Sequence, residues 1–259
     1  LLALDRPEDA RSVLDEALAR SSSAASSDLL LADGDWYRLA GRGDESIARY
    51  RAGVARSQGN KQKADALGRL GRALQERGDL AAAREALAQA VALDPRSAHL
   101  LGAEATAATE ALRLQEAGAG FDTALALQAD DYESLAGAGY LALRRGEPEA
   151  ARQLLLKALV IEPRYARAHM WLAVAEYTLG AEGAALDALQ RARQAEPKDP
   201  LPWQIESILR NDSGESEAAI AAAREALVRL PYLKSLNPLA SDSQGSANLG
   251  KALGDFGLE

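Results

Sequence analysis

The sequence predicts an all-α protein built from repeated pairs of antiparallel helices. Alanine, the residue that favours helix most, accounts for 57 of the 259 residues. Valine, isoleucine and threonine together account for only 15 residues, and aromatic residues for 5%, so the chain lacks the side chains that pack a β-sheet. The prolines at 163, 197 and 231 are 34 residues apart, and Pro95 precedes Pro163 by twice that interval. This period indicates a helical repeat array with one continuous core.

Residues 64–97 show how one period is used. Apolar and small residues recur every three or four positions up to Gly78-Asp79, which predicts a helix that ends at glycine. The same spacing resumes and stops before Pro95, which predicts a second helix. Each period therefore holds two antiparallel helices of about 12–14 residues.

The same pattern recurs along most of the chain. Residues 132–165 carry it at Leu135, Gly139, Gly146, Ala151, Leu155, Ala158 and Pro163. In period and in residue pattern the chain resembles the tetratricopeptide repeat (TPR) family. The resemblance implies a right-handed superhelical solenoid of six units: 27–60, 64–97, 98–131, 132–165, 166–199 and 200–233.

Both flanks depart from whole repeats. Residues 1–26 are expected to hold a lone second helix at 7–20 and a serine-rich loop. Residues 234–259 are expected to hold a loop and a terminal helix at 246–257 that starts or caps a further repeat. Half repeats at both ends, and a first residue other than Met, indicate a fragment or a processed chain.

Two irregularities interrupt the units themselves. Three residues, 61–63, are inserted after unit 27–60. Unit 98–131 lacks the central glycine, with residues 112–115 at its turn, and places Gly118 and Gly120 in its second helix. Because a glycine inside a helix costs about 0.5–1 kcal/mol relative to alanine, we expect this unit to be the softest.

Charge and composition narrow the range of partners. The net charge of −8 is spread along the chain without a basic tail or stripe, which argues against nucleic-acid binding and against an anionic membrane surface. No apolar run approaches the roughly 18 residues of a membrane-spanning helix, and no signal peptide is apparent. The alanine, arginine and leucine content suggests a bacterial source, with cytoplasm and periplasm both open.

The sequence offers no convincing catalytic, cofactor or metal site. His99 and His169 stand two units apart without metal-ligand spacing, and the chain has no cysteine. The segment 245–251 matches most of a phosphate-binding loop, but Ala252 follows it and no strand precedes it. We therefore expect a protein that is not an enzyme and that holds no cofactor.

The resemblance implies that the first helices line a concave groove. Their inward positions are polar or small in the first three units and largely apolar in the last three. The predicted binding strip consists of Tyr140, Leu143, Met170, Val174, Tyr177 and Ile208. Arg144 and Arg167 flank it and are expected to hold a carboxylate of the ligand. The alternative is that these residues pack between helices, or under the segment 232–259 folded back into the groove.

These observations favour a non-catalytic scaffold that binds a peptide, a helix or a partner domain in its groove. The family resemblance suggests bacterial envelope assembly, secretion or polysaccharide export. Lysine and asparagine are absent from the positions at which relatives clamp acidic chaperone tails, so no carboxylate clamp is expected. Two alternatives stay open: a recognition arm of a larger enzyme or signalling protein, and self-assembly through terminal half-repeats with Leu249, Leu253 and Phe256 packed on a second copy.

Overall fold

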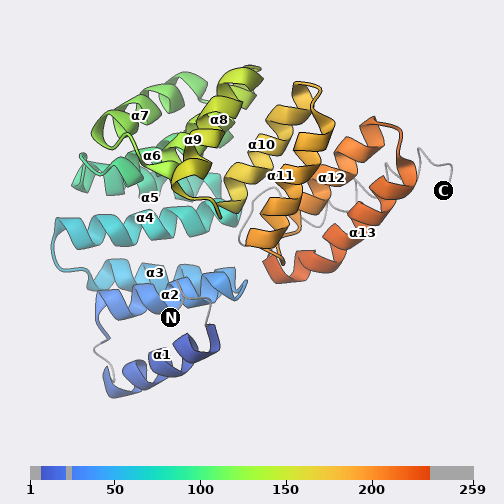
Figure 1. The fold of residues 1–259 in the computed structure, drawn as a ribbon. Helices are drawn as coiled ribbons and strands as arrows, with labels where there is room; N and C mark the ends of the chain where they lie inside the picture. The colour runs from blue at the N-terminus through green and yellow to red at the C-terminus, as the bar shows by residue number, and fades with distance from the viewer. Residues whose placement is uncertain (1–6, 22–24, 234–259) are drawn as a thin grey trace.

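The computed structural model describes residues 7–21 and 25–233, which form thirteen α-helices and contain no β-strand. After α1 (Pro7–Ser21), the helices form six antiparallel pairs stacked in a curved array (Figure 1). The first helices of the pairs are α2 (Ser27–Leu39), α4 (Asn60–Glu76), α6 (Ala98–Glu110), α8 (Tyr132–Arg145), α10 (Ala166–Thr178) and α12 (Leu201–Asp212). The second helices are α3 (Gly43–Arg56), α5 (Leu80–Leu93), α7 (Leu114–Leu127), α9 (Pro148–Ile161), α11 (Glu182–Ala195) and α13 (Ser216–Leu233). The all-α helical-repeat superhelix that the sequence predicts is confirmed.

In two pairs, a glycine in the first helix lets the second helix of the same pair cross closely. A Cβ atom added to Gly71 would stand 2.6 Å from Cγ of Leu87, and one added to Gly139 would stand 2.7 Å from Cγ of Leu155. Both leucines are fully buried. Because real Cβ contacts do not come this close, the crossing distance of these pairs depends on the missing methyl group.

The turn between the two helices of each pair contains one residue whose backbone is in the left-handed conformation. Five of the six turns place glycine there, with φ between 73° and 82°, at Gly41, Gly78, Gly146, Gly180 and Gly214. The turn after α6 has Leu112 instead, with φ 60°. Its N–H donates to the carbonyl of Thr109 at 3.0 Å, and the next N–H, of Arg113, donates to the carbonyl of Ala108 at 2.9 Å. The same pair of bonds closes the glycine turns, so the geometry is kept without the glycine.

The residues inserted at 61–63 lie inside a helix. They belong to α4, which has 17 residues, whereas the other first helices have 12 to 14. Because an α-helix has about 3.6 residues per turn, three extra residues add nearly one turn and leave the apolar face almost in phase. The insertion therefore lengthens the N-terminal end of α4 and does not disturb its packing.

A buried carboxylate fastens α1 to the first helix pair. The side chain of Asp33 in α2 is fully buried and forms ion pairs with Arg11 of α1 and Arg49 of α3, each at 2.7 Å. The Arg11 guanidinium also lies over the ring of Trp36, 4.8 Å from its centroid. One charge thus links three helices.

The last helix is longer than the proline spacing predicts. α9 and α11 end before Pro163 and Pro197, whereas α13 continues through Pro231 to Leu233. The last described helix therefore extends past its proline. Proline lacks an N–H, so its inclusion near the end of a helix costs one helical hydrogen bond. The helix predicted at 246–257 and the loop before it lie outside the described residues.

We predict that Leu112→Gly stabilises the protein. A non-glycine residue in the left-handed region costs about 1–2 kcal/mol, and the Leu112 side chain is exposed, so little packing is lost. Part of the gain is offset by the greater freedom of glycine in the unfolded chain, which leaves a net gain of about 0.5–1 kcal/mol. Urea unfolding followed by circular dichroism measures the difference. Leu112→Ala keeps the strain and should give no gain; a loss of stability in Leu112→Gly would show that this turn is not strained.

We predict that Asp33→Ala loosens α1. The variant removes the buried carboxylate that Arg11 and Arg49 share; because both arginines remain partly exposed, we expect a cost of about 1–3 kcal/mol. Hydrogen exchange measured by mass spectrometry should rise in 7–21 and leave residues 132–199 unchanged. The matched control is Asp15→Ala, because Asp15 is an exposed partner of the same Arg11 and should matter by less than about 1 kcal/mol. Equal effects of the two variants would reject the role of Asp33.

Candidate functional site

The first helices line the inner side of the array. Each of them contacts the next first helix closely, for example α6 with α8 and α8 with α10. Among the described residues, successive second helices have no comparable contact with one another. In a curved stack, the helices that approach one another form the concave side. The first helices α2 to α12 therefore form the concave side.

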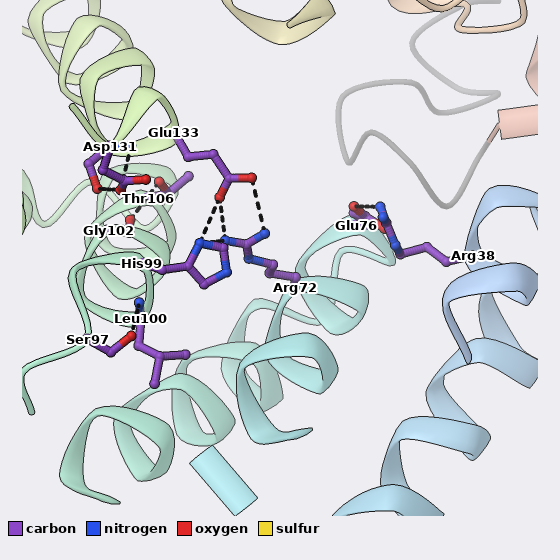
Figure 2. A network of polar contacts seen from close by, with 11 residues as sticks. Arg38, Arg72, Glu76, Ser97, His99, Leu100, Gly102, Thr106, Asp131 and Glu133 are labelled. Carbon is purple, nitrogen blue, oxygen red and sulfur yellow. Dashed lines mark hydrogen bonds and ion pairs between the residues drawn. The ribbon is translucent and has the colours of Figure 1, made fainter. Parts of the chain in front are cut away.

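In the N-terminal half of this face, ion pairs connect the first helices to one another. Arg72 of α4 pairs with Glu133 of α8 at 2.5 Å, and His99 of α6 stands 3.2 Å from the same carboxylate (Figure 2). Burial alone would raise the pKa of Glu133, but His99 and Arg72 overcome it and lower that pKa well below its usual range. Farther along, Arg38 of α2 pairs with Glu76 of α4 at 3.2 Å. Ion pairs in this half therefore join α4 to α8 and α2 to α4.

The second half presents an aromatic surface. The ring of Tyr140 in α8 stacks on the ring of Trp171 in α10, with centroids 4.7 Å apart and an interplanar angle of 11°. Leu143, Trp171 and Tyr177 are half-buried and pack against one core cluster formed by α8 to α12. Val174 is also half-buried. Trp171 is not in the predicted binding strip, because its place in the unit is not one of the inward positions. The sequence signal that could have identified Trp171 is that a large aromatic residue stands on the first helix that follows the one with Tyr140.

One residue of the predicted strip is not on the surface. Met170 is 1% exposed and packs in the core with Ala192 and Leu201. Its position on α10 faces the contact with α12, so the thioether fills a gap between repeats instead of meeting a ligand. The expectation that Met170 binds the partner is therefore wrong for the side chain as it lies here.

The remaining predicted residues lie at the two edges of the strip. Ile208 of α12 is 45% exposed and extends the apolar surface toward the last pair. Arg144 is exposed at the end of α8. Arg167 is half-buried, with its guanidinium carbon 6.0 Å from the Trp171 ring centroid. Burial alone would lower the pKa of Arg167, but the nearby Tyr165, Glu76 and Glu110 outweigh burial and raise that pKa.

The two histidines occupy different surroundings. His99 belongs to the ion-pair network, whereas His169 is buried and its Nε2 lies 2.9 Å from the carbonyl oxygen of Pro163. Within residues 7–21 and 25–233, no three His, Asp or Glu side chains gather in a way that could hold a metal ion. In the same part of the chain, no helix is both long and apolar enough to cross a membrane. The segment 245–251, with its partial phosphate-loop pattern, lies outside the described residues.

Comparison with known proteins agrees with this architecture. Models of the tetratricopeptide repeat match residues 64–97 and 137–200. No curated protein sequence matches the chain. Among solved structures, the APC/C hetero-tetramer Cut9–Hcn1 is similar, with a TM-score of 0.70 and 17% identity, over 96% of this chain and 46% of that chain. Pseudomonas aeruginosa pilF is also similar, with a TM-score of 0.54 and 20% identity, over 77% of this chain and 94% of that one.

The chain thus spans less than half the length of the first of these structures, and the likeness to both is one of fold. The two family matches supply the repeat sequence, and the helix pairs supply the geometry. Together they show that the chain is a tetratricopeptide repeat protein.

Proposed function

We propose that the protein is a non-catalytic scaffold that binds a partner protein or peptide in its concave groove. The observation that carries the proposal is the Tyr140–Trp171 stack, which is half-buried and joins the first helices α8 and α10. Rigid aromatic side chains supply large contact area at a low entropic cost, and they are enriched where proteins bind one another. The concave face is also the usual working surface of a solenoid.

The contrast between the two halves of the groove supports this location. In the first half, Arg72–Glu133 and Arg38–Glu76 are ion pairs within the array. In the second half, Val174, Tyr177 and Ile208 offer apolar area that no other described residue covers fully. An apolar patch with a polar rim is the usual form of a protein-binding site.

We also propose a cellular setting for this scaffold. The family resemblance, together with a composition that suggests a bacterial source, leads us to propose envelope assembly, secretion or polysaccharide export. Such pathways depend on scaffolds that hold other proteins in place, which is the role that the groove supports.

We predict that Val174→Glu combined with Ile208→Glu abolishes partner binding, because each adds a charge that the partner would have to desolvate. The test is capture from source-cell lysate, with cytosolic and envelope fractions kept apart, on immobilised wild type and variant of equal helicity. The matched control is Val160→Glu on α9, since Val160 is 82% exposed and lies on a second helix, away from the groove.

A protein held by the wild type and by Val160→Glu, but lost by the double variant, would support the groove and report the compartment. Equal retention by all three would reject the apolar strip. Loss in Val160→Glu alone would move the binding surface to α9 and its exposed apolar neighbours, Leu127, Leu156 and Ile161.

A further inference from the structure

The outer side of α9 carries large apolar side chains that the core does not use. Leu156 is 46% exposed, and Val160, one turn later on the same side of the helix, is 82% exposed. The residues with which α9 packs into the array are others, namely Ala151, Leu155 and Ala158. Packing within the array therefore does not require large apolar residues at positions 156 and 160.

The other repeats show what these two positions hold elsewhere. The counterparts of residue 156 in the other second helices are Arg51, Ala88, Asp122, Gln190 and Arg224. The counterparts of residue 160 are Ala55, Ala92, Ala126, Gln194 and Val228. Of the six second helices that the structure describes, only α9 has large apolar residues at both positions. Exposed apolar residues confined to one repeat indicate a contact surface of that repeat.

A hollow adjoins these side chains. It has a volume of about 410 Å³ and lies where the C-terminal part of α9 meets the loop between α7 and α8. Its walls are mostly apolar and are formed by Ala129, Asp130, Leu135, Lys157, Val160 and Ile161. A protruding apolar side chain therefore stands at the edge of a hollow that could hold a side chain of the same kind.

The rim of the hollow carries one charge of each sign. Lys157 and Asp130 are both exposed, and neither forms an ion pair with any residue in 7–21 or 25–233. A partner surface with a single sign of charge would be attracted by one of these residues and repelled by the other. A partner surface that presents a cation and an anion in the same arrangement would pair with both.

These features favour a second copy of the same surface. In an association with two-fold symmetry one patch meets itself, so each protruding side chain has to find a hollow and each cation an anion. The face of α9 meets both requirements, because Val160 stands beside the hollow and Lys157 shares its rim with Asp130.

We propose that two copies of the chain associate through α9 about a two-fold axis. Val160 of each copy enters the hollow of the other, and Lys157 of each copy pairs with Asp130 of the other. Because α9 is a second helix, this interface leaves the groove of each copy open. The inference goes beyond the scaffold role and does not depend on it, and it differs from assembly through the terminal half-repeats.

The first test is sedimentation equilibrium of the full chain over a range of concentrations. The mass of the wild type should rise from 27.4 kDa toward twice that value. Leu156→Glu combined with Val160→Glu places charges in the apolar centre and should raise the dissociation constant by more than about tenfold. The matched control is Val228→Glu, at the same position of the repeat in α13 and also exposed, which should leave the dimer unchanged. Circular dichroism should show equal helicity, because all the replaced side chains are exposed.

The second test examines the symmetry of the contact. Asp130→Lys and Lys157→Glu should each weaken the dimer, because each variant brings like charges together at both ends of the interface. A mixture of the two variants should restore association, because opposite charges then meet at both ends. A mixture that associates no more tightly than the separate variants would reject the two-fold arrangement.

Two further results would overturn the inference. A wild type that stays monomeric up to its solubility limit would do so, and loss of a captured protein in Val160→Glu would then assign the face of α9 to another protein. A dimer that the double variant of α9 does not weaken would favour association through the chain ends. The groove variant Val174→Glu with Ile208→Glu should remain dimeric, so failure of this inference and failure of the proposed function are distinguishable.

Discussion

The close crossing of the two helices in each pair is the constraint on which the rest of the structure depends. A small residue in the first helix meets a large one in the second, as Gly71 meets Leu87 and Gly139 meets Leu155. The crossing fixes the separation of the helices, and the separation fixes how far each pair rotates relative to the next. The curvature that brings first helices together, and with it the groove, follows from where methyl groups are absent.

Much of the fold could be predicted from the sequence, because helix formation and the 34-residue period are local properties. Glycine and proline mark most of the helix ends correctly, and the helical content follows from alanine. The exceptions are also instructive. Leu112 takes a backbone conformation that its side chain disfavours because two hydrogen bonds close the turn around it, and hydrogen bonds between residues leave no signature in composition.

The candidate site was less accessible to prediction, since it depends on which side chains meet across helices. Periodicity places Met170 on the inward face, but the contact with Leu201 of α12 buries it. The same reasoning passes over Trp171, whose stack with Tyr140 joins two repeats.

The turn at Leu112 has a consequence for how such arrays are recognised. The family models match 64–97 and 137–200 and leave the segment between them, which contains α6 and α7, without a match. That segment nevertheless keeps the helix pair and the closing hydrogen bonds of its neighbours. Its second helix also carries a large buried residue, Phe121, as the neighbouring second helices carry Leu87 and Leu155. A repeat can therefore lose its sequence signature while its geometry is preserved by the repeats on either side. Motif counts in proteins of this kind therefore set a lower limit on the number of structural repeats.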